Sequence, residues 1–375
     1  MGKRRGISFL NFLLNFIIAA IMAGLVIFVY FCFNYGVETT VTEIADNFNL
    51  SKIIPSENES TIEIPVVENP LSAAEIVNNS QDLVKRDEAG YYYAQIDENA
   101  KIIYDALMSN EVNLRKGNYK IEFGNQFNEL LNQENGTESL NSSYQQALDA
   151  LTLDHPEVFY LDISKMLLMI YSRKTILKTT YTVSIESEEN GNYFSDEFKT
   201  EEEVNQAVNR VEYIRDDLYN QLEGDTYNKI KDIHDCLVNE LEYEQTISKP
   251  NIRNIYGALV TKEVVCEGYA KAFKYILDGL DIPNIIVVGT ATNSSGVTES
   301  HAWSYVLMDD AWYAIDVTWD DPIIVGNGKL PEMEKYRYFL RGSETFNKNH
   351  TITGQVSDNG MKFIYPELSE LDYVY

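Results

Sequence analysis

Three residues that are far apart in the sequence have the side chains of a thiol nucleophile, its base and an orienting acid. Cys266 lies in VVCEGYAKAFKYILDGL (264–280), His301 begins HAWSYVLM (301–308), and Asp316 lies in AWYAIDVTW (311–319). A cysteine at a helix N-terminus experiences the positive end of the helix dipole, and a nearby imidazolium favours its thiolate further. His301 would accept the thiol proton and deliver it to a leaving amine, while Asp316 would orient the imidazole ring. Considered alone, a residue of each of these types is more often a buried residue without a chemical role or a solvated residue at the surface.

The elements around these residues are predicted to be one helix and three strands. Apolar residues recur every three to four positions after Cys266, which predicts a helix that Gly279 and Pro283 terminate. Strands are expected over 282–291, 301–308 and 311–319, the last two joined by a turn at Asp309 and Asp310.

The length of this turn decides the geometry of the site. A two-residue turn pairs Met308 with Ala311 and places His301 opposite Thr318, with Asp316 two residues away on the same face. A longer turn would change which residues pair across the hairpin and which face of the sheet Asp316 occupies.

The sequence blocks around the three residues resemble the motifs of the transglutaminase-like superfamily. VVCEGYAKAF, SHAWSYVL and AWYAIDVTWDDP correspond to the blocks that hold its Cys, His and Asp, and all three tryptophans of the chain lie in them. The resemblance covers about residues 225–322, and KYRYFLRGSETFNKNH resembles the tail of bacterial envelope members. It implies an α+β fold with a papain-like core, in which a Cys-bearing helix packs on an antiparallel sheet. It also implies that Cys266 is the nucleophile, His301 the base and Asp316 the orienting acid.

Other residues near these blocks are interpreted as structural. Tyr256 is one candidate for the second donor of an oxyanion hole, but an aromatic ring ten residues before the cysteine is more often part of the core. His234 and Cys236, on a predicted second helix, are interpreted as packed or solvated. An alternative is a structural disulfide between Cys236 and Cys266, as can form in an oxidising compartment.

The sequence upstream predicts a smaller α+β region and two further helices. Helical spacing occurs over 96–110 and 142–153, and residues 179–186 alternate as a strand does. Thr200 and Glu203 have the pattern of a capping box, followed by a long helix that we expect Gly224 to end.

The N-terminus predicts a membrane anchor. Lys3, Arg4 and Arg5 precede an apolar run over residues 9–33, which exceeds the roughly 20 residues needed to cross a bilayer. The positive flank predicts a cytoplasmic N-terminus and an extracytoplasmic remainder. A cleavable signal peptide is the alternative, although its apolar region is usually shorter.

Four segments are therefore expected along the chain. Residues 1–36 form the basic tip and transmembrane anchor, 37–88 a tether, 89–199 an α+β region of unknown role, and 200–375 the transglutaminase-like domain.

Charge and motifs exclude several other function classes. The formal net charge of −28 disfavours a nucleic-acid partner. The four histidines are scattered, and no CxxC or HExxH spacing occurs, so no metal is expected. GxGxxG and P-loop patterns are also absent, and no cofactor is expected.

Two functions remain in competition. The first is a membrane-anchored thiol enzyme that cleaves or transfers an acyl group from peptide or side-chain amides, with a protein or peptide as its substrate and a cell-envelope peptide as one candidate. The second is a catalytically idle binding module of the cell envelope. The intact set of Cys266, His301 and Asp316 favours the enzyme.

Overall fold

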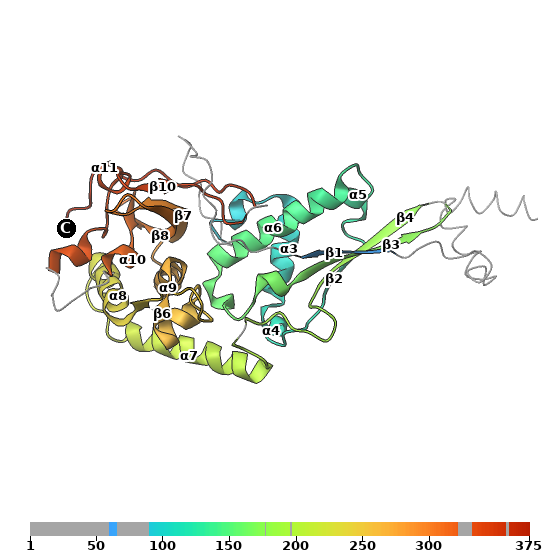
Figure 1. Cartoon of the computed structure of the whole chain (residues 1–375), viewed down its shortest axis with the longest axis horizontal. Helices are drawn as coiled ribbons and strands as arrows, with labels where there is room; N and C mark the ends of the chain where they lie inside the picture. The colour runs from blue at the N-terminus through green and yellow to red at the C-terminus, as the bar shows by residue number, and fades with distance from the viewer. Residues whose placement is uncertain (1–59, 66–89, 177, 196, 322–331, 358–359) are drawn as a thin grey trace, which may run out of the picture. The chain divides into compact units, whose positions relative to one another are not determined.

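The computed structural model describes residues 60–65, 90–176, 178–195, 197–321, 332–357 and 360–375 (Figure 1). Of these residues, 60–61, 171–176 and 178–181 belong to a small unit, and the others belong to a large unit. The predicted anchor at 9–33 and nearly all of the predicted tether at 37–88 lie outside the described residues. Within the described ranges no helix has both the length and the apolar character needed to cross a bilayer.

Two four-stranded sheets account for most of the strands. The first has the order β1-β3-β4-β2 and the second the order β10-β7-β8-β9. A parallel pair, β5 and β6, precedes the second sheet in the chain. The strands are β1 (Ser60–Pro65), β2 (Ile121–Gly124), β3 (Leu167–Lys174), β4 (Thr179–Glu186), β5 (Glu242–Tyr243), β6 (Glu263–Val264), β7 (Asn284–Thr292), β8 (Thr298–Met308), β9 (Ala311–Ile315) and β10 (His350–Ile352).

Helices α6, α9 and α11 of the large unit contact strands of the second sheet. The α-helices are α3 (Glu98–Ser109), α4 (Glu111–Leu114), α5 (Asn128–Leu131), α6 (Gly136–Asp154), α7 (Glu201–Tyr219), α8 (Thr226–Glu240), α9 (Cys266–Asp278), α10 (Val317–Asp320) and α11 (Ser343–Phe346). Short 3₁₀ turns are η2 (Tyr93–Gln95), η3 (Pro156–Val158), η4 (Ile163–Lys165) and η6 (Glu332–Tyr336), and η5 (Gly257–Thr261) is a π-helical turn.

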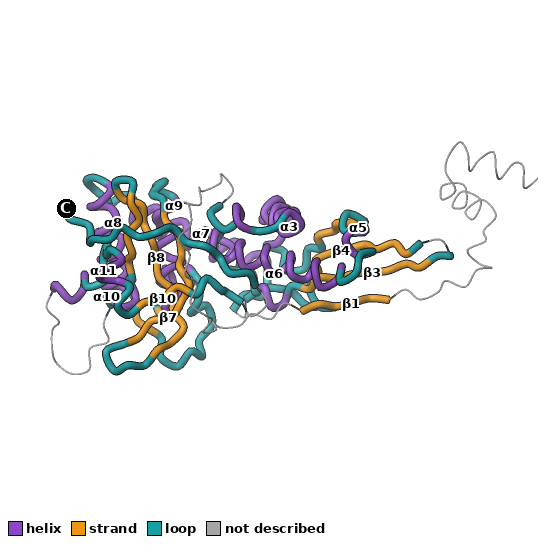
Figure 2. Tube along the Cα trace, turned by 90° about the horizontal axis from the view of Figure 1, so that it is seen from above, coloured by secondary structure: helices purple, strands orange, loops and turns teal. Residues whose placement is uncertain are grey.

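The predicted helix on an antiparallel sheet is confirmed. Cys266 is the first residue of α9, and α9 packs against β7 and β8, as Figure 2 shows. All three strand pairs of this sheet are antiparallel. Phe273, Ile276 and Leu277 are fully buried, because the helix is covered on several sides and forms part of the core.

The predicted hairpin is correct at its turn and wrong at its far end. Asp309 and Asp310 both have positive φ angles, as a two-residue type I′ turn requires, and Met308 pairs with Ala311. The strand ends at Ile315, however, and not at residue 319, because Asp316 accepts a hydrogen bond from the Trp319 N–H and caps α10. The expected pairing of His301 with Thr318 therefore does not form.

Upstream, the structure extends or trims several predicted elements. The helix expected over 142–153 is the longer α6, and the strand expected over 179–186 is β4. Thr200 caps α7 by accepting from the Glu203 N–H, but this helix ends at Tyr219 and not at Gly224. β3 and β10 were not predicted. β3 begins with four buried residues and therefore lacks the alternation of a half-exposed strand.

A buried pair joins α8 to the short helix α10. His234 Nε2 lies 3.1 Å from Asp320 Oδ2, and both side chains are fully buried. Asp320 Oδ1 also accepts the Tyr338 N–H at 2.8 Å. A four-residue helix cannot be stable by itself, so these bonds fix its position.

Removing one member of this pair should destabilise the fold. We expect His234→Ala to lower the free energy of unfolding by about 3 kcal/mol, because the buried Asp320 carboxyl would lose its side-chain hydrogen-bond partner and the imidazole would leave a cavity. Urea denaturation of the full chain, followed by tryptophan fluorescence, measures this. Asp232→Ala, on the exposed side of the same helix, is the control and should change stability by less than about 0.5 kcal/mol. Equal effects of the two changes would show that the pair does not hold α10.

Candidate active site

The structure brings Cys266, His301 and Asp316 together from three different elements. Cys266 opens α9, His301 lies on β8, and Asp316 precedes α10. His301 Nε2 lies 2.7 Å from Asp316 Oδ2. The Cys266 side chain lies near enough to His301 to raise the pKa of its imidazole. Since Asp316 occupies Nε2, Nδ1 is the ring nitrogen that remains for the sulfur.

The imidazole of His301 is held in its protonated form. Burial alone would lower its pKa, but the charge of Asp316, the hydrogen bond to Asp316 and the interaction with Cys266 raise the pKa to about 10. The pKa of Asp316 is lowered in spite of its burial, because His301 and His350 stabilise the carboxylate. At neutral pH His301 is therefore an imidazolium beside the thiol, an arrangement that favours a thiolate nucleophile.

The sequence did not reveal the second histidine that contacts Asp316. His350, in the first position of β10, places Nε2 3.0 Å from the same Oδ2 atom that His301 contacts. Burial and the nearby charge of His301 lower the pKa of His350, so it is neutral at pH 7 and donates one N–H. The Trp319 N–H donates to Oδ1 at 3.1 Å, and the carboxylate is bound on both oxygens. His350 was visible in the sequence only as part of the family-like tail.

Aromatic rings enclose the two histidines. The ring of Trp319 lies 5.3 Å from His301 and 4.8 Å from His350, measured between centroids. Phe346 stacks on His350 at 4.0 Å. These rings exclude water from the Asp316 carboxylate, and electrostatic interactions are stronger in such a low-dielectric site.

The N-terminus of α9 presents Cys266 without a disulfide. The alternative of a Cys236–Cys266 bridge is wrong, because both thiols are free. Burial raises the pKa of the Cys236 thiol. Cys266 is the first residue of its helix, so its backbone N–H has no carbonyl partner within the helix.

A tyrosine that the sequence analysis did not select lies close to Cys266. Tyr243 pairs with Val264 between β5 and β6. Burial is the main cause that raises its pKa to about 12, and the neighbouring Cys266 and Glu299 add to this effect, so its hydroxyl keeps its proton at neutral pH. Tyr256, the earlier candidate for this position, packs instead between the rings of Phe159 and Phe198.

His301, Asp316 and His350 also satisfy the spacing of a metal-ligand set. Their ligand atoms lie within 4.8 Å of one another and all three side chains are buried. Two histidines and a carboxylate are a set that Zn²⁺ accepts. The hydrogen bonds among the three side chains already account for their arrangement, and we assign no metal to them.

Comparison with a family model agrees with this geometry. Residues 216–317 match the model described as the transglutaminase-like superfamily, and the match contains Cys266, His301 and Asp316. This segment is a transglutaminase-like domain. The matched residues make up just over a quarter of the chain. A search of curated proteins finds no match.

Several solved structures resemble part of the chain at low identity. They include a TGase (15% identity, 40% of this chain and 44% of that chain, TM-score 0.27) and a candidate cysteine protease from Cytophaga hutchinsonii (13%, 40% and 57%, 0.26). The periplasmic domain of TgpA from Pseudomonas aeruginosa, bound to ethylmercury, is a third (16%, 41% and 63%, 0.24). The chain thus spans between 44% and 63% of the length of these structures. Similarity at this level does not extend to activity.

The raised pKa of His301 should depend on Asp316. In Asp316→Asn the attraction to the carboxylate is lost while burial still disfavours the imidazolium. We therefore expect the pKa of His301 to fall well below 10, toward the ordinary value of about 6.5. NMR titration of the chain with labelled histidine measures this pKa. Asp310→Asn, in the exposed turn, is the control and should leave it unchanged. An unchanged pKa in Asp316→Asn would contradict the assigned pairing.

Proposed function

We propose that the protein is a membrane-anchored thiol enzyme that transfers an acyl group from a peptide or side-chain amide, through a thioester on Cys266, to water or to an amine. The observation that carries this proposal is the imidazole of His301 between Cys266 and Asp316. This order of thiol, imidazole and carboxylate is what nucleophilic catalysis on an amide requires.

The first half of the reaction forms the thioester. The Cys266 sulfur attacks the amide carbonyl carbon, and the carbonyl electron pair moves to the oxygen. As the tetrahedral intermediate collapses, the C–N bond breaks and His301 gives its proton to the leaving amine. Asp316 stays ionised and holds the ring in position throughout.

The second half restores the enzyme. The now neutral His301 accepts a proton from water or from a second amine as this nucleophile attacks the thioester. The C–S bond then breaks, and the thiolate and imidazolium are regenerated. Water yields cleavage or deamidation and an amine yields a crosslink, so the outcome depends on which acceptor reaches the thioester.

Two donors are proposed for the oxyanion that forms on the carbonyl oxygen. The backbone N–H of Cys266 is available at the start of α9, and Tyr243, which pairs with Val264 two residues before Cys266, has a protonated hydroxyl. Donors of this kind stabilise charge that appears only in the transition state.

The cellular setting of the reaction is inferred from the sequence. We infer that residues 9–33 anchor the chain in the cell membrane, and that Lys3, Arg4 and Arg5 keep the N-terminus in the cytoplasm. The catalytic domain would then act outside the cytoplasm on a protein or peptide, with a peptide of the cell envelope as one candidate.

A peptide assay with three readouts tests the proposed chemistry. Synthetic peptides that contain Gln and Asn are incubated with the protein, with and without a biotinylated primary amine. Mass spectrometry then distinguishes backbone cleavage, conversion of an amide to an acid, and attachment of the amine. We expect at least one of these products, and a loss of at least about 1,000-fold in Cys266→Ala. If neither protein gave a product, the domain would be an idle binding module, and if both gave the same products at the same rate, Cys266 would not be the nucleophile.

A further inference from the structure

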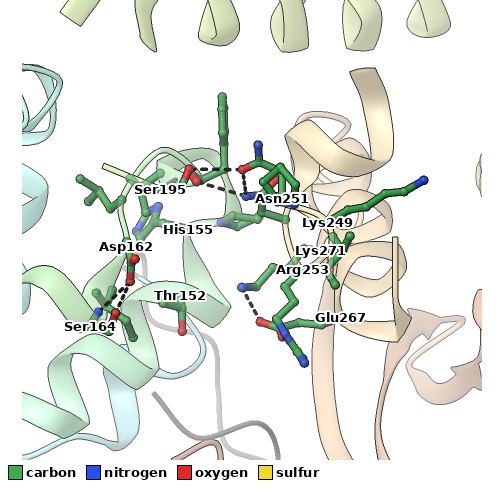
Figure 3. A pocket seen from close by; sticks show the side chains of 18 of the residues that line it. Thr152, His155, Asp162, Ser164, Ser195, Lys249, Asn251, Arg253, Glu267 and Lys271 are labelled. Carbon is green, nitrogen blue, oxygen red and sulfur yellow. Dashed lines mark hydrogen bonds and ion pairs between the residues drawn. The ribbon is translucent and has the colours of Figure 1, made fainter. Parts of the chain in front are cut away.

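A polar pocket lies beside the N-terminus of α9. It has a volume of about 370 Å³, within the usual range for ligand sites. One wall comes from the upstream α+β region and includes His155, Phe159 and Ser195 (Figure 3). The other comes from the loop 247–254 and from Glu267 and Lys271 of α9.

Several polar groups in this pocket are already bonded, either to one another or to residues outside the pocket. Ser195 Oγ donates to Asn251 Oδ1, and Asn254 Nδ2 donates to the same oxygen. Asp162 accepts from Ser164 and pairs with Lys165, and Lys249 pairs with Glu263. Lys165 thus compensates the charge of Asp162, and Glu263 compensates the charge of Lys249.

The uncompensated charge of the pocket is positive. Lys271 lies 2.7 Å from Glu267 Oε1, and Arg253 contacts Glu267 Oε2. Two cations therefore share one carboxylate, in a chain whose formal net charge is −28. His155, on the facing wall, has its pKa raised by Glu157 in spite of burial and adds no negative charge.

Arg253 has unused capacity to bind an anion. Its guanidinium offers five N–H donors, and its contact with Glu267 is single and long, at 3.5 Å. The side chain is about one-third exposed (37%) and lines the pocket beside Glu267. A planar guanidinium in this state is suited to bidentate binding of a carboxylate.

The backbone fixes this arginine next to the nucleophile. The Val265 N–H donates to the Ile252 carbonyl oxygen at 2.9 Å. Val265 directly precedes Cys266, and Ile252 directly precedes Arg253, so this bond holds the two segments together. Gly268 permits this approach, because a Cβ there would lie 2.7 Å from the same oxygen. The backbone of Arg253 is therefore held near that of Cys266.

We infer that this pocket binds an acidic side chain of the peptide substrate, through Arg253 with support from Lys271, within a few residues of the amide that Cys266 attacks. The inference rests on the proposed function, because it names the substrate class of the same site. It also gives the α+β region upstream a role, as the wall that closes the pocket opposite Arg253.

Peptide binding in an inactive background tests this inference. The dye-labelled peptide Ala-Glu-Ala-Gln-Ala-Glu-Ala and its counterpart with Gln for each Glu are titrated into the Cys266→Ala protein, and fluorescence anisotropy is measured. We expect the acidic peptide to bind at least about tenfold more tightly than the neutral one, since charge-assisted bonds are about twice as strong as neutral ones. Arg253→Gln should remove this preference, and Arg253→Lys should keep part of it.

The controls separate the pocket from a general effect of charge. Arg210→Gln removes an exposed arginine of α7 and should leave the preference intact. Similar affinity for the two peptides, absence of binding of both, or a preference that survives Arg253→Gln would overturn the inference. Competition by inorganic phosphate at the peptide's own concentration would overturn it too, because it would indicate a general anion site. Binding is measured without turnover, so failure of the proposed chemistry would not affect this result.

Discussion

The buried carboxylate of Asp316 is the constraint on which the rest of the site depends. Its side chain is fully buried, and an ionised carboxylate in such a place costs several kcal/mol unless it is well bonded. The bonds come from His301 on β8, His350 on β10 and the Trp319 N–H of α10. Three elements must therefore converge on one carboxylate before the imidazole can face Cys266.

A second carboxylate repeats this arrangement one helical turn later. Asp320 follows Asp316 by four residues and is also fully buried, with His234 of α8 as its partner. The two acids disfavour each other's ionisation, and burial together with this repulsion raises the pKa of Asp320 to about 6. Three of the four histidines of the chain are thus bound to the two acids at the start and end of α10, the capping residue Asp316 and the last residue Asp320. These buried bonds fix the position of α10.

The sequence predicted the parts of this arrangement that depend on local patterns. The helix start at Cys266, the turn at Asp309 and Asp310 and the antiparallel sheet follow from apolar spacing and turn chemistry, and the structure confirms them. The end of β9 could not be predicted, because AWYAIDVTW has strand-like composition and only the cap at Asp316 bends it into a helix. His350 was missed because it reaches Asp316 from 34 residues away on a three-residue strand, which has no periodicity of its own. The pocket beside Arg253 also depends on contacts between distant segments.

Trapping the acyl-enzyme tests the central claim most directly, namely that Cys266, His301 and Asp316 act as one nucleophilic unit. The intact protein is mixed with p-nitrophenyl acetate at neutral pH, and the acetylated residue is identified by mass spectrometry before and after hydroxylamine treatment. The account predicts rapid acetylation at Cys266, with hydroxylamine removing the acetyl group as it does from a thioester, and slow acetylation in His301→Ala. Acetylation of Cys236 at the same rate as Cys266, or an unchanged rate at Cys266 in His301→Ala, would contradict it.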